Sequence, residues 1–250
     1  MNSTPLPRQF ALDISHIPSP SLDNFLPGQD LALISTLRDL AMSWKDASQT
    51  KDHTLNQRWI YWWGSEGSGR SHLLHALSNS AKKLQLQHFQ LRPDEPLSWV
   101  RLEEVMGDLA NQEQASVITV DDVDRLDERL AAALFRILNT VHGSKAMYIF
   151  MTGNAAPQTL KMREDLRTRL GWGLVFQTHS LTDNEKIQAL HEAAVARGLV
   201  LSPDVLPWLL NHFYRDMTNL MALMDALDAY SLETKRAVTL PLVRELLQPK

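Results

Sequence analysis

The 250-residue chain is long enough for one or two domains, and its 44% apolar and 22% charged residues allow it to bury a core. A formal net charge of −4 excludes a protein that coats DNA by bulk electrostatics, although it leaves room for a local basic patch. The absence of cysteine excludes disulfides, cysteine-ligated zinc and thiol nucleophiles.

The chain carries no recognisable targeting or membrane signal. No stretch approaches the roughly 18–20 consecutive apolar residues that a membrane helix needs. The N-terminus, MNSTPLPRQF, lacks the apolar core of a secretory signal peptide. A chain without cysteine also suits a reducing compartment. We therefore expect a soluble cytoplasmic protein.

Strands and helices alternate over the first part of the chain. Residues 1–18 contain prolines that break any helix, so we expect a flexible tail, then a first helix over 30–45 and a polar loop over 48–57. Beyond the loop, short apolar runs predict strands over 59–63, 87–91, 117–120, 146–151 and 174–176. Apolar positions at helical spacing predict helices over 71–84, 98–109 and 127–141. This alternation predicts an α/β domain over 19–178 with a parallel sheet covered on both faces.

The strands stop after Thr182. Apolar positions at helical spacing predict four more helices, over 183–197, 203–213, 217–233 and 240–247. Thr182 or Asp183 can cap the first of them, and Pro203 suits the first turn of the second. The methionines and leucines between 217 and 227 form a stripe typical of core packing rather than of a cofactor site. We expect residues 179–250 to form a small all-α domain.

A glycine-rich segment lies between the strand at 59–63 and the helix at 71–84. Its sequence from Gly64 to Ser71 has the form G-x-x-x-x-G-R-S, close to the phosphate loop of nucleotide-binding proteins. Glycines let the backbone turn its N–H groups onto phosphate oxygens, and the helix that follows adds a partial positive charge. An ordinary glycine-rich turn is the alternative. The expected nucleotide-binding residues are Gly64, Ser65, Glu66, Gly67, Ser68, Gly69, Arg70, Ser71 and His72.

One letter of this loop departs from the usual pattern, because Arg70 stands where lysine is usual. Arginine keeps the positive charge and can grip a phosphate with two donors, but it is bulkier and planar. We expect nucleotide binding to survive this change and do not assume efficient hydrolysis. Ser71 would ligate Mg²⁺ through its hydroxyl group.

Two carboxylates follow the strand at 117–120, at the edge where parallel sheets bind their ligands. Asp121 would hold Mg²⁺, through water, opposite Ser71. Asp122 stands where a glutamate is usual as the base for the attacking water, and it is one methylene shorter. A misplacement of about 1 Å can lower a rate roughly a hundredfold. A helix-capping acidic cluster is the alternative.

Asn154 follows the strand at 146–151. Beside a phosphate loop, a short polar side chain at this place can orient the attacking water, which makes Asn154 a catalytic candidate together with Asp122. An asparagine ahead of Ala-Ala-Pro is equally typical of a turn.

Taken together, these residues resemble the AAA+ ATPases, and within them the DnaA branch and its Hda family of DnaA inactivators. The resemblance spans nearly the whole chain and rests on the segments 22–28, 64–74, 151–154, 165–173 and 215–217. The phosphate loop is shared by many ATPases, whereas the stretch from Arg169 to Gly173 is far more specific. The resemblance implies an AAA+ P-loop domain with a parallel five-stranded sheet, in which 22–28 packs by the adenine, followed by an α-helical lid.

The resemblance assigns roles to two arginines. Arg169 would be the arginine finger, which stabilises the charge that develops when a phosphoryl group is transferred in a neighbouring subunit. An ordinary surface arginine beside Arg163 and Arg167 is the alternative. Arg215 would approach the chain's own phosphates from the lid, and an arginine that merely ends a helix is the alternative.

The resemblance also implies that the chain binds a sliding clamp. Hda proteins begin with a clamp-binding peptide of the form Q-L-x-L-x-L, and residues 9–14 fit this pattern, although Asp13 departs from its more apolar versions. A mobile tail can insert apolar anchors into a pocket while a polar residue makes hydrogen bonds. The clamp-binding residues would be Gln9, Phe10, Leu12 and Ile14. A solvated tail is the alternative.

A negative regulator of replication initiation is the function that the resemblance implies. The protein would bind ADP (or ATP) and Mg²⁺, dock on the DNA-loaded sliding clamp (the β subunit of DNA polymerase III), and stimulate hydrolysis of the ATP bound by DnaA. Its own hydrolysis would be weak or absent. DnaA carries a DNA-binding domain after its lid and this sequence stops at Lys250, so contact with DNA would be indirect, through the clamp. AAA+ modules usually meet through their nucleotide faces, so a homodimer or homo-oligomer is also expected.

Two other classes of function are alternatives. An autonomous AAA+ ATPase of the helicase-loader or remodelling type would turn over ATP without any partner. A nucleotide kinase is disfavoured, because the helical C-terminal part has no evident site for a phosphate acceptor.

Overall fold

The computed structural model describes residues 19–45, 53–212, 216–234 and 236–247. The chain divides into two compact units, one over Pro20–Ser180 and one that begins at Leu181, and each is described by itself. Within the described residues, no helix is long and apolar enough to cross a membrane.

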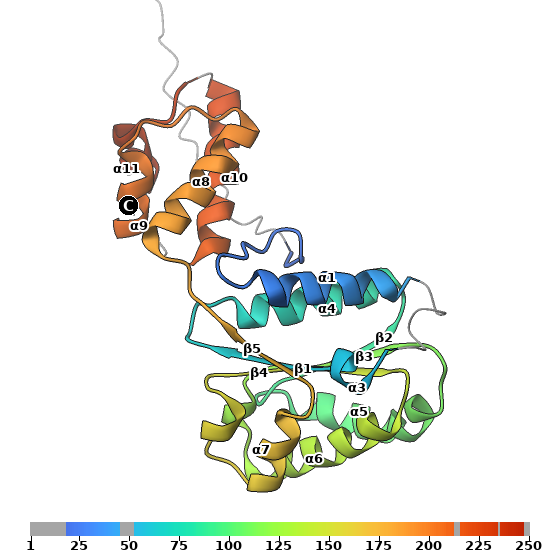
Figure 1. The fold of residues 1–250 in the computed structure, drawn as a ribbon. Helices are drawn as coiled ribbons and strands as arrows, with labels where there is room; N and C mark the ends of the chain where they lie inside the picture. Colours follow the sequence, from blue (N-terminus) through green and yellow to red (C-terminus); the bar gives the residue numbers. More distant parts are fainter. Residues whose placement is uncertain (1–18, 46–52, 213–215, 235, 248–250) are drawn as a thin grey trace, which may run out of the picture. The chain divides into compact units, whose positions relative to one another are not determined.

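The first unit is built on a five-stranded parallel sheet, as the sequence predicted (Figure 1). Its strands are β1 (Trp59–Gly64), β2 (Gln87–Leu91), β3 (Ser116–Val120), β4 (Met147–Gly153) and β5 (Leu174–Thr178). Their order across the sheet is β2-β3-β4-β1-β5. All four pairings are parallel, so the carboxyl ends of the strands meet at one edge. Every residue of β3 and β4 is buried, which explains why these strands are mostly apolar.

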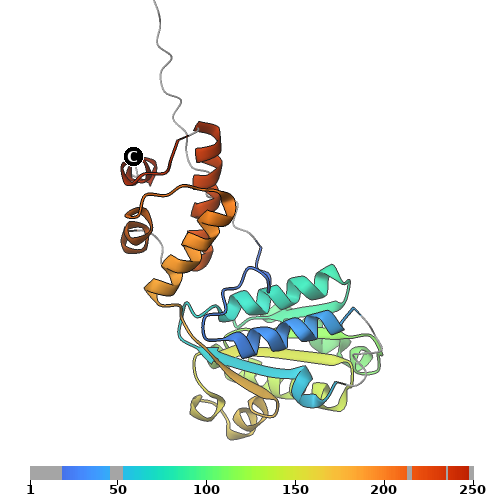
Figure 2. The same ribbon diagram turned by 45° about the horizontal axis from the view of Figure 1, so that its top comes forward.

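Helices cover both faces of the sheet (Figures 1 and 2). One face carries α1 (Leu31–Ser43) and α4 (Arg70–Lys83), which run side by side; the other carries α5 (Pro96–Ala110), α6 (Glu128–Gly143) and α7 (Glu164–Leu170). Two single 3-10 turns, Val123–Arg125 and Pro157–Thr159, complete the connections. Neighbouring residues of β1 serve opposite cores, because side chains alternate along a strand: Trp62 packs toward α1 and α4, and Tyr61 toward α5 and α6.

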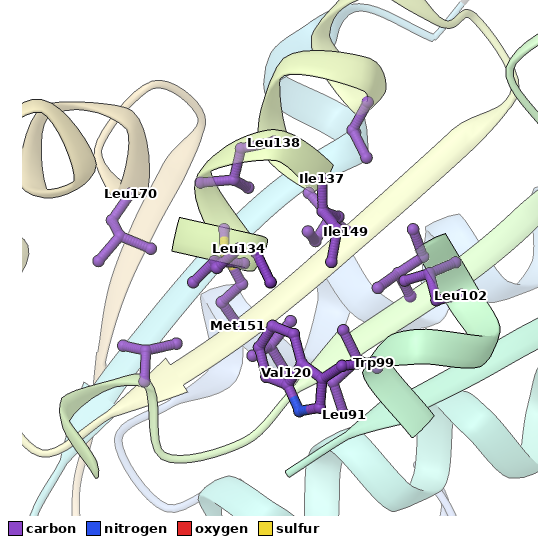
Figure 3. Packing of buried hydrophobic residues seen from close by; sticks show 14 of the residues in the cluster. Leu91, Trp99, Leu102, Val120, Leu134, Ile137, Leu138, Ile149, Met151 and Leu170 are labelled. Carbon is purple, nitrogen blue, oxygen red and sulfur yellow. The ribbon is translucent and has the colours of Figure 1, made fainter. Parts of the chain in front are cut away.

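The core under α5 and α6 is the larger of the two in this unit (Figure 3). Leu134, Ile137 and Leu138 of α6 pack against Ile149 and Met151 of β4. Full burial of such a side chain contributes roughly 1.5–3 kcal/mol. From α5, the fully buried Trp99 adds its ring to this core and donates its Nε1–H to the carbonyl of Arg92 at 2.9 Å.

The second unit is helical, with α8 (Asp183–Arg197), α9 (Val205–His212), α10 (Met217–Thr234) and α11 (Leu240–Leu247). Thr182 and Glu185 form a capping box at the start of α8, and Gly198, with φ +69°, ends it. Arg197 of α8 makes an ion pair with Asp225 of α10 at 2.6 Å. The core is lined with leucines, and the methionine stripe of α10 belongs to it, as expected: Met224 is fully buried.

Two boundaries predicted from the sequence are wrong. The polar stretch expected to be a loop as far as Gln57 ends in a short helix, α3 (Leu55–Arg58). Thr54 and Gln57 form a capping box that starts this helix, a polar device that apolar periodicity does not register. The second lid helix begins at Val205 and not at Pro203, because the N–H of Val205 bonds to the carbonyl of Ser202 in a turn at 3.0 Å.

Gly173 is required by a close backbone approach, and its replacement provides a test of the sheet. A Cβ at this position would overlap the backbone carbonyl of Trp59 in the neighbouring strand β1. Since a buried strand cannot move aside, we expect Gly173→Ala to lower the free energy of unfolding by about 3 kcal/mol in urea denaturation. Gly107→Ala is the matched control: it meets open space on α5 and should be neutral or stabilising. Equal stability of the two variants would contradict this packing.

Candidate nucleotide-binding site

The loop between β1 and α4 has the backbone that a phosphate loop needs. Gly67 and Gly69 have φ angles of +77° and +83°, a region that glycine adopts without steric cost. Gly69 directly precedes α4. The first N–H groups of a helix have no partner within the helix, so the start of α4 offers donors and a partial positive charge to an anion.

The end of β5 contacts this loop through hydrogen bonds of Thr178. The hydroxyl of Thr178 donates to the carbonyl of Trp63 at 3.2 Å and accepts from the hydroxyl of Ser68 at 2.9 Å. A Cβ on Gly64 would overlap Thr178, so only glycine fits at the start of the loop. Ser65 also contacts the segment after β5, with its Oγ 3.1 Å from that of Ser180. The loop is therefore held in shape by the neighbouring strand.

An N-terminal segment packs against the same loop. The ring of Phe25 lies 2.5 Å from where a Cβ on Gly69 would be and 5.6 Å, centroid to centroid, from the ring of His72. The Nε2–H of His72 faces two acceptors, the carbonyl of Ser21 at 3.1 Å and Oδ1 of Asn24 at 3.0 Å. Burial lowers the pKa of His72, with a smaller contribution from His75. A neutral imidazole thus anchors this segment to α4.

The structure brings the expected carboxylates to the sheet edge beside the loop. Asp121 and Asp122 directly follow β3, and Thr152 lies at the end of the neighbouring β4. The Thr152 hydroxyl donates to Oδ1 of Asp121, and the backbone N–H of Asp122 lies 3.1 Å from both that oxygen and Oγ1 of Thr152. Thr152 is a site residue that the sequence analysis did not single out. Its signal is a hydroxyl inside a fully buried strand.

Asp122 lies between two guanidinium groups. Its Oδ1 is 3.4 Å from Nη2 of Arg70, and its Oδ2 is 3.5 Å from Nη1 of Arg125. Its backbone adopts a left-handed conformation with φ +47°, which is strained for an aspartate. Burial and the charge of Asp121 raise the pKa of Asp122 more than the arginines lower it. The phosphate loop and the acidic edge are therefore joined by the Arg70–Asp122 ion pair.

Asn154 lies beyond β4, and it is exposed. Its backbone N–H donates to Oδ1 of Asp124 at 2.9 Å, and the hydroxyl of the buried Tyr61 donates to the carbonyl of Ala155 at 2.6 Å. These bonds fix the turn after β4 against the acidic edge. A role for the Asn154 side chain in orienting water stays a prediction.

Arg169, the expected finger, is held between two aromatic rings. Its guanidinium carbon lies 3.8 Å from the ring centroid of Phe135 on α6 and 4.8 Å from that of Trp172. Its Nη1 is buried and has no hydrogen-bond partner within the described residues. Its neighbour Arg163 pairs with Asp165 at 2.6 Å, and its guanidinium carbon lies farther from the Phe135 ring centroid, at 5.8 Å. Arg169 is thus held between two aromatic rings, with one buried nitrogen that has no hydrogen-bond partner among the described residues.

Three of the expected functions are not tested by these contacts. Arg215 and the clamp-binding residues 9–14 lie outside the described residues. Ser71 is the second residue of α4, and Asp121 directly follows β3. Within the described part of the chain, no group of three or more side chains is arranged to hold a metal ion. Mg²⁺ often takes only one or two protein ligands, so their role stays a prediction.

Comparison with known proteins identifies the family. The sequence profile described as "Bacterial DnaA ATPAse domain" matches residues 21–177, and the profile described as "Hda, lid domain" matches residues 183–247. The chain belongs to the bacterial DnaA ATPase family. It is an Hda/DnaA-related AAA+ protein with an α/β P-loop fold and a helical lid, which confirms the family and the fold predicted from the sequence.

Individual proteins resemble this AAA+ chain over most of its length. An uncharacterized protein of Haemophilus influenzae is 31% identical over 245 residues, covering 96% of this chain and 98% of the relative. AMPPCP-bound DnaA from Aquifex aeolicus is 20% identical with a TM-score of 0.63, covering 87% of this chain and 70% of that one. Domain III of DnaA from Thermotoga maritima is 20% identical with a TM-score of 0.61, covering 92% and 96%. At these identities the two solved structures support the fold alone.

The lowered pKa of His72 predicts a pH dependence of stability. The folded protein favours the neutral imidazole of His72. The contribution of this side chain to the free energy of unfolding is therefore complete above the ordinary pKa of 6.5, and it is lost as the pH falls through the lower pKa of the folded state. We expect His72→Gln, which keeps a donor but cannot titrate, to lose less stability than the natural protein between about pH 7.5 and about pH 5.5 in urea unfolding. An identical loss in both proteins would contradict the prediction.

Proposed function

We propose that this AAA+ protein is a negative regulator of replication initiation that binds ADP in its own phosphate loop and stimulates hydrolysis of the ATP bound by DnaA. It would act while docked on the DNA-loaded sliding clamp, in the cytoplasm. The relationship to the DnaA ATPase and to the Hda lid supports the choice of DnaA as its target. The AMPPCP bound by related DnaA structures supports an adenine nucleotide as its ligand.

The position of Arg169 is the observation that carries this proposal. Its guanidinium carbon lies over the rings of Phe135 and Trp172, while its buried Nη1 lacks a hydrogen-bond partner within the described residues. These rings belong to the α6–α7 face of the sheet, whereas the phosphate loop leads into α4 on the opposite face. An arginine held there is suited to nucleotide on another protein rather than to its own. A finger supplied in this way stabilises the charge that develops in phosphoryl transfer.

The surroundings of Asp122 support a nucleotide that is kept rather than hydrolysed. A general base must be free to reach the attacking water, and Asp122 lies between the guanidinium groups of Arg70 and Arg125. When a magnesium ion is bound, it would screen the phosphate charge, and the Ser71 hydroxyl and Asp121 are the residues that would hold it. Arg215 of the lid and Asn154 would complete the contacts around the nucleotide.

Arg169→Ala provides the main test of the proposal. We expect it to lower the stimulated rate of DnaA ATP hydrolysis by about 10³-fold or more, with ADP binding unchanged, because only the charge lent to the partner is lost. The measurement is phosphate release from ATP-bound DnaA with clamp-loaded DNA. Arg163→Ala is the matched control, since Arg163 lies on the same segment, is exposed and paired with Asp165, and lies 5.8 Å from the Phe135 ring centroid compared with 3.8 Å for Arg169.

Two results would contradict the proposal. If Arg169→Ala still stimulated DnaA ATP hydrolysis fully, Arg169 would not be the arginine finger. Brisk ATP turnover by the natural protein, without DnaA or clamp, would favour the autonomous ATPase instead. An activity that needs both partners and Arg169 supports the regulator.

Removal of residues 9–14 tests docking on the clamp. We expect the shortened protein to lose clamp affinity, measured by surface plasmon resonance on immobilised clamp, and to keep its thermal unfolding midpoint, because the deleted residues belong to the proline-containing tail expected over residues 1–18. A matched control replaces only Asp13, the residue that departs from the apolar pattern, by Leu and should bind at least as well. Unchanged affinity after the deletion would disprove this part of the proposal.

A further inference from the structure

The phosphate loop carries a guanidinium that is fixed by a second residue. Arg70 opens α4, at the position from which the usual lysine reaches the phosphates of a nucleotide. Its side chain is only 13% exposed, and its Nη2 lies 3.4 Å from Oδ1 of Asp122. Its Nη1 is buried and has no hydrogen-bond partner within the described residues. One terminal nitrogen of the Arg70 guanidinium therefore pairs with Asp122, and the other has no hydrogen-bond partner among the described residues.

The carboxylate that holds Arg70 is itself held in place. The backbone N–H of Asp122 lies 3.1 Å from Oγ1 of Thr152 and from Oδ1 of Asp121. Its other oxygen lies 3.5 Å from Arg125, whose side chain is 71% exposed and so interacts mostly with solvent. Arg70 is thus the buried partner of Asp122, and Arg125 is the solvent-exposed one.

A lysine could not be used in this way. Its ammonium is a flexible point charge, whereas the planar guanidinium can bond one anion with one nitrogen and a second anion with the other. A fixed positive charge beside a diphosphate performs the screening for which most nucleotide sites recruit a divalent cation.

We propose that Arg70, positioned by Asp122, replaces the divalent cation in nucleotide binding, so that this site takes a nucleoside diphosphate equally well with and without magnesium. The inference rests on the proposed binding of ADP at the Gly64–Ser71 loop. Magnesium can still bind at Ser71 and Asp121, but the affinity for ADP does not depend on it. Asp122 serves binding as a positioning residue, which gives a reason for the aspartate where a longer catalytic glutamate is usual.

The test is the affinity of the full chain for ADP, measured by isothermal titration calorimetry in excess magnesium chloride and in excess EDTA. For the natural protein we expect the two dissociation constants to agree within about twofold, since the screening charge is part of the protein. Arg70→Lys should bind ADP roughly tenfold or more weakly in EDTA than in magnesium, because the fixed fork is lost. Asp122→Asn should show the same new dependence on magnesium, as it frees Arg70 from its anchor.

Arg125→Lys is the matched control, because it makes the same substitution in the exposed partner of the same carboxylate. Its two dissociation constants should stay equal. The ratio of the ADP dissociation constants in EDTA and in magnesium reports on the charge beside the phosphates. A general loss of packing would change both constants and leave their ratio the same. Thermal melts of each variant verify the fold, and if a variant unfolds, the natural protein alone decides the question.

Each outcome has a distinct meaning. A natural protein that loses tenfold or more of its ADP affinity in EDTA overturns the inference, while the proposed ADP binding stands. A protein that binds no ADP in either condition overturns the proposed function as well. Equal affinities in the natural protein, together with a magnesium dependence confined to Arg70→Lys and Asp122→Asn, support the inference.

Discussion

The site depends on the parallel pairing of β1, β4 and β3. Parallel strands bring their carboxyl ends to one edge, so the phosphate loop after β1 meets the carboxylates after β3, although the two lie far apart in the chain. Thr152, at the end of β4, lies between them and fixes Asp121 and Asp122 by hydrogen bonds. The Arg70–Asp122 ion pair then joins loop and edge. A shift of one residue in any pairing would turn these side chains to the opposite face and separate them.

The same sheet also keeps the nucleotide and the candidate finger apart. Trp62 faces the core under α1 and α4, where the phosphate loop is anchored, and its neighbour Tyr61 faces the core under α5 and α6. Arg169 belongs to that second face, against Phe135. Close-packed cores on both faces make the sheet a rigid support, so the loop on one face and Arg169 on the other are held at fixed positions within this unit.

Apolar periodicity predicted the elements well because burial is what forms them. The sheet strands, the helices that cover them and the four lid helices lie where the pattern placed them, within a few residues. Apolar periodicity gave the wrong helix boundaries where polar groups determine the start of the helix. The capping box of Thr54 and Gln57 starts α3, and a turn closed on the carbonyl of Ser202 delays α9 beyond Pro203. Such bonds are local but carry no apolar period.

Sequence alone was enough to establish the fold class and the family and to predict a phosphate loop, because strand, glycines and helix are adjacent in the chain and need only local conformation. It also placed two carboxylates at the carboxyl edge of a parallel sheet, since strand direction alone settles that. The pairing of Arg70 with Asp122, and the contacts of Arg169 with Phe135 and Trp172, could be seen only once the chain was folded. These partners come from segments that meet only after the sheet and its helices have packed, and no local pattern encodes the distances between them.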